Sequence, residues 1–600
     1  MRTNCTSLSK EESRAIDKFL ERLAKRRRVI GACLYGSKVA GYESPDSDID
    51  IIVVVKGYPY TVRYSYFRSE GLRISALIVD HIALQKDAQT GLLGEFVAGR
   101  LLHTYEAIIN QELFKSIEIL YKKRVILEEL LGIIRTTSIL CTEISFPLEF
   151  IVFSKIKQRS LVYPSALYSY YKIYTGRQAA KNLAFALEGY RKALEEIITN
   201  DKELLILKTS STTTDVNLLQ ISKKRLALNK QAERNNLRLM LARKLQVLNS
   251  YFVHAYAGRR VLHYTMQEAE SKIRRHRTQP ISLPEFMAYP QEHYWKLEEG
   301  QVITRSNKKW LDLVAKSFGL LSYTILKRIH LGSVNSRTTC YTLQDTYNPD
   351  RIVSVVAKNF AKLKGLKWAT LNFWALSNYA LSKYPLKIDP LFRLGTEYKA
   401  LRYLRNEVGL NTPAILAIDL ERLILVTNFV EGQSMHRIIQ DSLKKKLTAG
   451  AKNIFWIKAI GKNFAMVHAT HFTLGNIKPN NIIVNNADNS NGSVFFTSLD
   501  QFDFSENGAG SDPVWDIIQF LCRSLKRTTN TSVAKEIVRE FLSGYFSFDQ
   551  ASTTNDKASK IKDLRQELFQ KSMDYLGQFY PLISSSVARS IHEEISRFAD

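Results

Sequence analysis

GACLYGSKVAGYESPDSDIDIIVVV, residues 31–55, is the stretch that decides the fold of the N-terminal part of this chain. It holds a short apolar run, the pair Gly36-Ser37, a polar loop, and a second apolar run that opens with Asp48 and Asp50. Because strand side chains alternate between the two faces of a sheet, both aspartates are predicted to point the same way. Adjacent carboxylates repel each other, so this pair predicts a divalent cation between them rather than two solvated turn acids.

The backbone N–H groups of Gly36-Ser37 are expected to be free near a helix start, where they can hold phosphate oxygens. Ten residues separate Ser37 from Asp48, and this pattern resembles the signature of the polymerase-beta-like nucleotidyltransferases, especially their minimal and aminoglycoside-type members. The resemblance covers roughly the first hundred residues. It implies that Asp48 and Asp50 bind Mg²⁺ or Mn²⁺, and that Gly36 and Ser37 hold the phosphates of ATP or another NTP.

The same family uses a third carboxylate on a later strand. Asp80 is the candidate, because it ends the apolar run RISALIVD at residues 73–80. On this interpretation Asp80 binds a second metal ion and helps to deprotonate the hydroxyl group of the acceptor.

The chain of 600 residues is too long for a single core and is predicted to form about three to four domains. Its formal charge of +27 favours a polyanionic partner, with nucleic acid first and an anionic membrane surface second. A dispersed, solvated basic surface is the alternative. The five cysteines lack metal-ligand spacing, the N-terminus is polar and no apolar run is long enough to span a membrane, so a cytoplasmic protein is expected.

The middle of the chain, residues 112–267, has helical periodicity almost throughout. Two basic clusters within and just after it favour contacts with an RNA backbone, although a solvated helix face is an equally good interpretation. Residues 279–300 contain three prolines and are predicted to be an extended connector. The expected architecture is therefore α+β and multidomain: a small mixed-sheet domain (1–105), an all-α basic domain (106–300) and a third domain (301–600).

The third predicted domain has its own set of motifs. A strand ends in Lys358, a helix carries Glu397 near its start, and Asp500 ends a later strand. Before Asp500 comes LGNIKPNNIIV, residues 474–484. This order is similar to a two-lobed protein-kinase-like fold over roughly residues 320–530, and the closest likeness is to the small atypical archaeal kinases of the RIO type and the KEOPS complex.

The kinase resemblance implies that Lys358 pairs with Glu397 to hold phosphates, and that Asp516 braces the catalytic loop. The strand at 423–432 would receive the adenine. The family's catalytic aspartate is replaced by an amide, which cannot act as a base near neutral pH, and the glycine-rich loop is reduced to Gly332. A pseudokinase that still binds ATP is the interpretation that follows. Its catalytic-loop and metal positions are Asn476, Lys478, Asn481 and Asp500, the last two being the predicted magnesium ligands.

Three functions remain open at the level of sequence. The first is a nucleotidyltransferase that moves a nucleoside monophosphate to an acceptor, which is RNA (for example tRNA), a protein side chain or a small hydroxylated molecule. The second is a non-catalytic scaffold that senses ATP at one or both sites. The third is an active atypical kinase. Because the N-terminal acids alone form a full catalytic set, the first function is favoured, with the kinase-like domain as its regulator.

Overall fold

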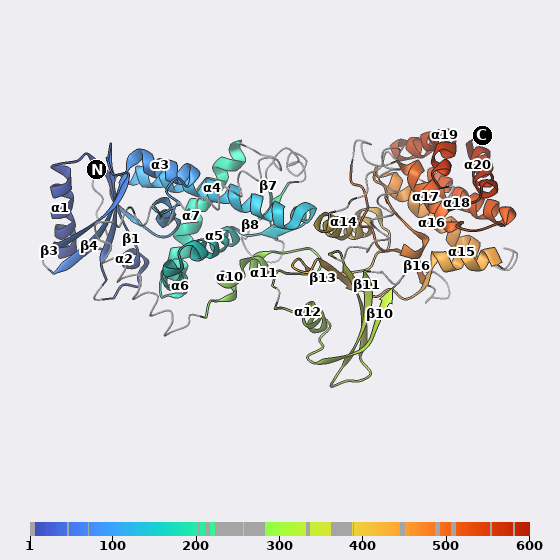
Figure 1. The fold of residues 1–600 in the computed structure, drawn as a ribbon, viewed down its shortest axis with the longest axis horizontal. Helices are drawn as coiled ribbons and strands as arrows, with labels where there is room; N and C mark the ends of the chain where they lie inside the picture. Colours follow the sequence, from blue (N-terminus) through green and yellow to red (C-terminus); the bar gives the residue numbers. More distant parts are fainter. Residues whose placement is uncertain are drawn as a thin grey trace. The chain divides into compact units, whose positions relative to one another are not determined.

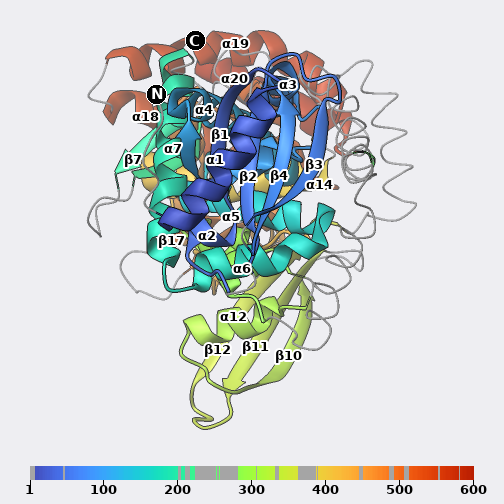
Figure 2. The ribbon, with the colours of Figure 1, turned by 90° about the vertical axis from the view of Figure 1, so that its left-hand side faces the viewer.

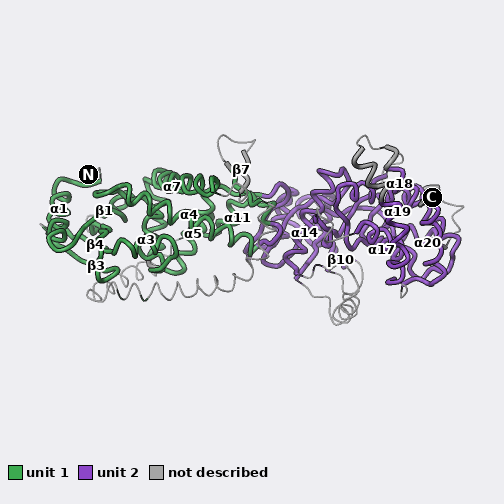
Figure 3. The backbone as a smooth tube through the Cα atoms, turned by 90° about the horizontal axis from the view of Figure 1, so that it is seen from above, with its two compact units in different colours: residues 1–136, 141–296 green, residues 137–140, 297–600 purple. Residues whose placement is uncertain are grey.

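The computed structural model describes most of the chain, and two compact units account for it. Figure 3 colours these units: residues 1–136 with 141–296 form unit 1, and residues 137–140 with 297–600 form unit 2. The predicted limits at 105 and 300 remain predictions. The residues described are 7–44, 47–69, 71–200, 205–209, 217–222, 252, 256, 282–305, 307–331, 337–361, 387, 389–444, 451–485, 492–505, 512–551, 555–579 and 582–599.

Unit 1 begins with a five-stranded mixed sheet of order β3-β4-β2-β1-β5 (Figure 1). The central pair β2·β4 is parallel, whereas β1·β2, β3·β4 and β1·β5 are antiparallel. The sequence predicted a small mixed sheet for the N-terminal part, but not the order or direction of its strands. The strands are β1 (Val29–Tyr35), β2 (Ile49–Val55), β3 (Val62–Ser69), β4 (Leu72–Asp80) and β5 (Glu106–Ile109).

Helix α1 (Lys10–Ala24) covers one face of this sheet (Figure 2). It starts where Ser9 and Glu12 form a reciprocal capping box, which satisfies two backbone N–H groups of the first turn. Ile16 and Phe19 of α1 pack with strand residues such as Ile51 and Val53 in one buried cluster. Since β2 is buried on both faces over residues 51–55, the apolar run predicted to be an internal strand is one.

The middle of unit 1 is mainly helical, and in addition contains a small sheet of order β6-β8-β7. Residues 282–296, expected to be an extended connector, instead contain two short helices. The helices of unit 1 after α1 are α2 (Ser37–Ala40), α3 (His81–Thr90), α4 (Gln111–Thr137), α5 (Leu148–Val162), α6 (Leu167–Thr175), α7 (Ala179–Asn200), α10 (Glu285–Ala288) and α11 (Pro290–Tyr294), with 3₁₀ turns at Ala98–Leu102, Ser138–Thr142 and Pro164–Ala166; the strands are β6 (Ser145–Phe146), β7 (Leu205–Thr209) and β8 (Asn217–Ile221).

Unit 2 opens with a six-stranded sheet of order β10-β11-β12-β14-β13-β9. Helix α12 (Trp310–Ser317) packs Trp310 and Val314 against Val355 and Val426 of this sheet. Helix α14 (Pro390–Tyr403) begins after Asp389, whose carboxylate caps the backbone N–H of Phe392. The strands are β9 (Gln301–Ile303), β10 (Tyr323–Leu331), β11 (Thr338–Asp345), β12 (Ile352–Asn359), β13 (Ile415–Asp419) and β14 (Ile424–Asn428).

The rest of unit 2 is helical around a second small sheet of order β15-β16-β17. The predicted fold class, α+β with a mixed sheet, a helical middle and a sheet-containing C-terminal part, is confirmed. The elements are a π-helical turn (Leu404–Val408), β15 (Gln433–Ser434), α15 (Met435–Lys444), α16 (Ala451–His468), a 3₁₀ turn (Pro479–Asn481), β16 (Ile482–Asn485), β17 (Ser493–Phe496), α17 (Pro513–Ser524), α18 (Thr531–Ala551), α19 (Asn555–Gly577) and α20 (Ser585–Ala599).

Several sequence predictions fall outside the described residues. They include Gly332 and both basic clusters of the middle region, which are Lys223, Lys224, Arg225, Lys230, Arg234, Arg238, Arg243 and Lys244, and Lys272, Arg274, Arg275, His276 and Arg277. Within the described ranges no helix is long and apolar enough to cross a membrane. Four of the five cysteines (Cys33, Cys141, Cys340 and Cys522) are described, and each is a buried free thiol.

Candidate active site

The strand register places Asp50 between two neighbours on the central sheet of unit 1. Asp50 of β2 stands opposite Tyr35 of the antiparallel strand β1 and beside Ser75 of the parallel strand β4. Asp48 lies just before β2, and its Oδ1 atom is 2.7 Å from Nε of Arg73. Residues two apart share a face of a strand, but Asp48 lies outside β2, so a common face for Asp48 and Asp50 stays a prediction.

Gly36 lies directly against Asp50. Its φ is +84°, a backbone conformation that side-chain-bearing residues rarely adopt, and a Cβ atom placed there would be 2.4 Å from Oδ2 of Asp50. Ser37 follows as the first residue of α2. Only glycine therefore fits at position 36, because any side chain would displace the carboxylate that the site needs.

The structure does not bring Asp80 to the end of the sheet that carries Asp50, so its role as the third catalytic carboxylate stays a prediction that the strand register does not support. Asp50 pairs with Ser75, whereas Asp80 pairs with Val55 at the far end of β2. Five residues of strand separate the two acids, which is roughly 16 Å. Asp80 instead caps α3, since its carboxylate accepts the backbone N–H groups of Tyr58 (2.8 Å), Ile82 (2.9 Å) and Ala83 (3.2 Å).

The oxygen groups near Asp50 could hold one divalent cation if substrate phosphates complete its coordination. Asp48, Asp50 and the hydroxyl of Ser75 are the oxygen groups that the register aligns on this face. No group of three acids, histidines or cysteines able to hold a metal ion occurs within the described ranges. Mg²⁺ commonly uses one or two carboxylates together with substrate phosphates, so the pair suffices for one ion bound with its NTP.

A pocket of about 230 Å³ opens beside Asp50. Asp50 is the only carboxylate among its described lining residues, and the side chain of Arg100 faces the acid's end of the pocket. Arg100 lies over the ring of Tyr35 with 4.8 Å from Cζ to the ring centroid, and it donates to the hydroxyl of Tyr64 at 2.8 Å. Burial lowers the pKa of Arg100, but its interactions with Tyr35, Tyr64 and Asp50 act in the opposite direction, and the net effect is a raised pKa. Aromatic rings form much of the wall: Tyr35, Tyr42, Tyr64, Tyr66, Phe96, Tyr163 and Tyr170.

His103 is a buried polar group in the same pocket wall. Its Nδ1 atom is 2.9 Å from the hydroxyl of Tyr174, while its Nε2 atom has no hydrogen-bond partner. Burial, together with the charges of Arg159 and Lys122, lowers the pKa of His103 to about 3. The imidazole is therefore neutral at physiological pH.

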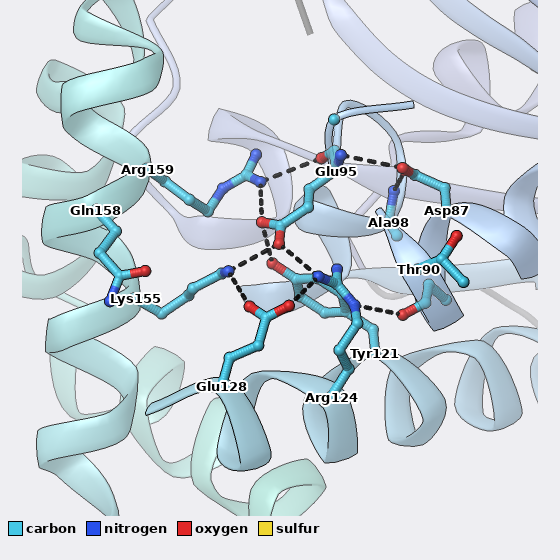
Figure 4. Close-up of polar contacts among 12 residues, drawn as sticks. Asp87, Thr90, Glu95, Ala98, Tyr121, Arg124, Glu128, Lys155, Gln158 and Arg159 are labelled. Atoms are coloured by element: carbon cyan, nitrogen blue, oxygen red, sulfur yellow. Dashed lines mark hydrogen bonds and ion pairs between the residues drawn. The ribbon is translucent and has the colours of Figure 1, made fainter. Parts of the chain in front are cut away.

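A buried ion network supports the pocket from behind (Figure 4). Glu95 has three cationic partners: Arg124 at 2.9 Å, Lys155 at 2.7 Å and Arg159 at 3.0 Å. These cations hold the pKa of Glu95 far below its usual value despite burial, which acts in the opposite direction. Since Arg159 also lines the pocket, this network fixes one wall of the site relative to helices α4 and α5.

A single carboxylate holds the loop that carries Glu95. Asp87 of α3 accepts four backbone N–H groups, those of Leu93 (2.8 Å), Glu95 (3.0 Å), Val97 (3.2 Å) and Ala98 (2.9 Å). Burial raises the pKa of Asp87, and these hydrogen bonds counteract that rise. The loop between α3 and the following 3₁₀ turn is thereby fixed without strand pairing.

A larger groove of about 1170 Å³ runs along α3, α4 and α7 in unit 1. Its described lining includes none of the residues that the sequence predicted for either site. Size alone therefore does not identify the functional pocket here.

Unit 2 brings together three of the residues predicted for the kinase-like site. Lys358 of β12 contacts the carboxylate of Glu397 of α14, and its Nζ atom is 3.7 Å from Oδ1 of Asp500. Arg393, one helical turn before Glu397, also binds Asp500, with 2.8 Å from Nε to Oδ2. The carboxylate predicted to bind magnesium is thus already paired with a guanidinium group.

The predicted catalytic loop is held by two charged groups. Asp516 accepts the backbone N–H of Leu474 at 2.5 Å and lies 3.3 Å from Nε2 of His468, so it braces this loop. Arg523 donates to the side-chain oxygen of Asn476, the residue at the position of the missing base. This contact leaves Asn476 bound as an acceptor, which is a structural and not a basic role.

Asn481 and Lys478 lie next to each other in the same loop. The backbone N–H of Asn481 donates to the carbonyl of Lys478 at 2.8 Å, and its carbonyl accepts both the N–H and the hydroxyl of Thr497. These contacts involve the main chain of Asn481. Its role as a metal ligand stays a prediction.

Sequence reasoning missed the charged partners of the predicted aspartates and the polar groups of the pocket. Arg73 could not be found from spacing, because its contact with Asp48 depends on the register of β2 and β4. Arg393 left a usable signal, since it precedes Glu397 by four residues on a helix and so shares its face. Arg100 and His103 lie in an apolar stretch with no motif.

Comparisons with known proteins agree with the N-terminal assignment. Residues 17–107 match the family model described as polymerase beta, nucleotidyltransferase. No curated protein sequence matches the chain. This family match supports a transferase activity of the nucleotidyltransferase type for the N-terminal part.

Two solved structures illustrate the likenesses of larger segments. A nucleotidyltransferase-like protein from Exiguobacterium sibiricum is 12% identical, with 35% of this chain and 98% of that chain covered and a TM-score of 0.16. Vaccinia related kinase 3 is 12% identical, with 48% of this chain and 94% of that chain covered and a TM-score of 0.19. TM-scores this low carry no argument about function.

Proposed function

We propose that unit 1 is a metal-dependent nucleotidyltransferase that moves a nucleoside monophosphate from an NTP to an acceptor hydroxyl. The observation that carries this proposal is Asp50, which lies against Gly36 at the edge of the aromatic pocket. The family match over residues 17–107 supports the same reaction class.

In this mechanism Asp48 and Asp50 hold one Mg²⁺ or Mn²⁺ ion, which would neutralise charge on the triphosphate. The backbone at Gly36 and Ser37 binds phosphate oxygens, and Arg100 offsets negative charge beside Asp50. The acceptor oxygen forms a bond to the α-phosphorus while the bond to pyrophosphate breaks. The proton of the hydroxyl passes to Asp50, since Asp50 is the only carboxylate among the described residues of the pocket.

The acceptor is proposed to be RNA, with tRNA as one candidate, or a protein side chain. The formal charge of +27 supports an RNA acceptor because a polyanion is attracted over the whole surface. The chain's own basic clusters are the expected contacts. A cytoplasmic location accords with these partners and with the free thiols of the described cysteines.

Unit 2 is proposed to be a regulatory nucleotide-binding unit without kinase activity. Lys358 and Glu397 form the ion pair that would hold phosphates, and Arg523 occupies the side chain of Asn476. A second candidate function is a non-catalytic ATP sensor. It is favoured by one observation, the ion pair between Asp48 and Arg73, which competes with a metal ion for Asp48.

Incubation of the full chain with α-³²P-labelled NTPs, Mg²⁺, and RNA and protein acceptors tests the reaction. Asp50→Asn is expected to lower transfer by at least about 100-fold, because an amide cannot take the proton or bind the metal comparably. Asp80→Asn is the matched control: it makes the same charge change at the other end of the sheet, keeps a capping oxygen and is expected to retain transfer.

Unchanged transfer by the Asp50 variant would refute the assignment. If the wild-type chain labels no acceptor but still binds NTP, the sensor function is correct. Label from γ-³²P-ATP that is lost in Asp500→Ala would instead establish kinase activity in unit 2.

A further inference from the structure

Among the described residues of unit 2, four cations around Asp500 face three carboxylates: Arg337, Lys358, Lys387 and Arg393 against Glu397, Asp500 and Asp503. Glu397 is paired with Lys358, and Asp500 is paired with Arg393. Arg337 approaches the same cluster, and no ion pair joins it to another of the described residues. Buried cations in excess of anions are unfavourable unless another anion joins them.

Arg337 is the clearest sign that an anion is missing. It precedes β11, is only 8% exposed, and donates from Nη1 to the carbonyl of Phe360 at 3.3 Å, while its Nε atom has no hydrogen-bond partner. The ring centroid of Phe360 is 5.0 Å from Nζ of Lys358 and 5.7 Å from Cζ of Arg393. Three cationic groups therefore converge on one aromatic residue.

The electrostatics of this cluster agree with its geometry. The pKa of Arg337 is lowered by burial first and by the positive charge of Arg393 second. Lys387 adds another cation: burial lowers its pKa to about 8, and its ammonium group donates to the carbonyl of Phe502. A buried guanidinium beside like charges, with one N–H unsatisfied, is the environment in which an anionic ligand is most stabilising.

We propose that the cluster of Arg337, Lys358, Lys387 and Arg393 binds the polyphosphate of a nucleoside triphosphate without a divalent cation. Arg393 neutralises Asp500 in place of a metal ion. This inference rests on the proposal that unit 2 is a nucleotide site, and it replaces the sequence-based expectation of magnesium there.

Two physical arguments favour an anion over a metal ion at this point. The guanidinium fork of arginine matches phosphate oxygens in a bidentate way that an ammonium group cannot reproduce. Adding Mg²⁺ beside two guanidinium and two ammonium groups would increase repulsion, whereas a triphosphate reverses it. Asp500 would also have to release Arg393 before it could bind a metal.

Hydrogen exchange of the full chain, resolved by peptide, tests this proposal because it separates the two units. With ATP in EDTA, peptides from β11, β12 and α14 are expected to become protected, with an affinity within about twofold of that in Mg²⁺. Adenosine at equal concentration is expected to give no protection. Arg337→Gln is expected to weaken ATP binding by at least about tenfold, which is the loss of a charged hydrogen bond.

Arg328→Gln is the matched control, since Arg328 is exposed on β10 of the same sheet and the charge change is identical. Asp500→Asn separates the two kinds of site: an arginine-held site keeps or tightens ATP binding, whereas a magnesium site loses it. Unchanged exchange in peptides far from the cluster verifies that each variant is folded.

Protection of these peptides by ATP only in Mg²⁺ would overturn the inference and leave unit 2 as an ordinary metal-dependent nucleotide site. Protection by adenosine equal to that by ATP would also overturn it. No protection under any condition would refute both the inference and the nucleotide site of unit 2, without bearing on transfer by unit 1.

Discussion

Each unit pairs a predicted metal aspartate with an arginine, but the two pairs lie in different environments. In unit 1 the side chains of Asp48 and Arg73 are 30% and 42% exposed, whereas in unit 2 those of Asp500 and Arg393 are 14% and 9% exposed. An exposed ion pair contributes little and exchanges readily with water, while a buried pair is costly to break. The same contact therefore leaves one aspartate open to a metal ion and closes the other.

The buried pair should give the largest effect when it is broken. Arg393→Gln removes the described cation closest to Asp500, since Lys358 is 3.7 Å away, and removing one partner of a buried ion pair typically costs about 3–5 kcal/mol. Hydrogen exchange measures this cost as a decrease in the free energy of opening of helix α14. The double change Arg393→Met with Asp500→Leu, which removes both charges, is expected to restore most of it; a double variant no more stable than Arg393→Gln would contradict this account.

An effect of intermediate size on stability is expected from His103, a buried imidazole in unit 1. Its folded-state pKa of about 3 lies below the unfolded value of 6.5, so the folded state binds fewer protons on acidification. Its stabilising contribution is therefore present above pH 6.5 and is lost as the pH falls toward 3. Between pH 8 and 5 the loss is about 2 kcal/mol for this residue.

Chemical denaturation of unit 1 across this pH range measures the effect of His103. His103→Asn is expected to flatten the pH dependence by that amount, while Tyr174→Phe, which removes the partner of Nδ1 and keeps the imidazole, is expected to retain it. An equally steep pH dependence in His103→Asn would show that other groups are responsible.

The exposed pair should give the smallest change in stability and a gain in metal binding. Arg73→Gln is expected to alter the free energy of unfolding by less than about 1 kcal/mol. Because the guanidinium no longer competes for Asp48, the affinity of unit 1 for Mn²⁺ in the presence of NTP should rise several-fold. Titration of the full chain with Mn²⁺, followed by its paramagnetic resonance signal, measures this rise; Arg68→Gln on the neighbouring strand β3 is the control.

The sequence was sufficient to propose the site residues that lie close to one another along the chain. Gly36, Ser37, Asp48 and Asp50 lie within one strand, turn and strand, so alternation and spacing predicted their common face. The sequence was insufficient for Asp80, because the position of an acid at the end of an apolar run does not show which residue of a neighbouring strand it pairs with. Asp50 is the second residue of β2 and Asp80 the last of β4, and only the parallel register shows that they are at opposite ends.

The dependence on strand pairing also explains why the sequence did not predict the arginine partner of Asp48. The partner of Arg73 is set by the alignment of Ile49 with Ile74, a fact of strand pairing and not of local sequence. Lys358 and Glu397 were paired by analogy with an ordered set of motifs, and the structure places them in contact. Nothing in that analogy concerns Arg393, although its helical spacing from Glu397 could have indicated it.

Asp87 has a consequence for how freely this protein can change its sequence. Its carboxylate binds main-chain N–H groups of residues 93–98, which every residue except proline provides. Substitutions along this loop other than proline therefore leave these four hydrogen bonds available, whereas the buried side chains of Leu93, Phe96, Val97 and Ala98 remain limited by packing. The path of this loop beside the pocket thus depends on one carboxylate and on main-chain groups and, apart from the contacts of Glu95, not on hydrogen bonds from the loop's own side chains.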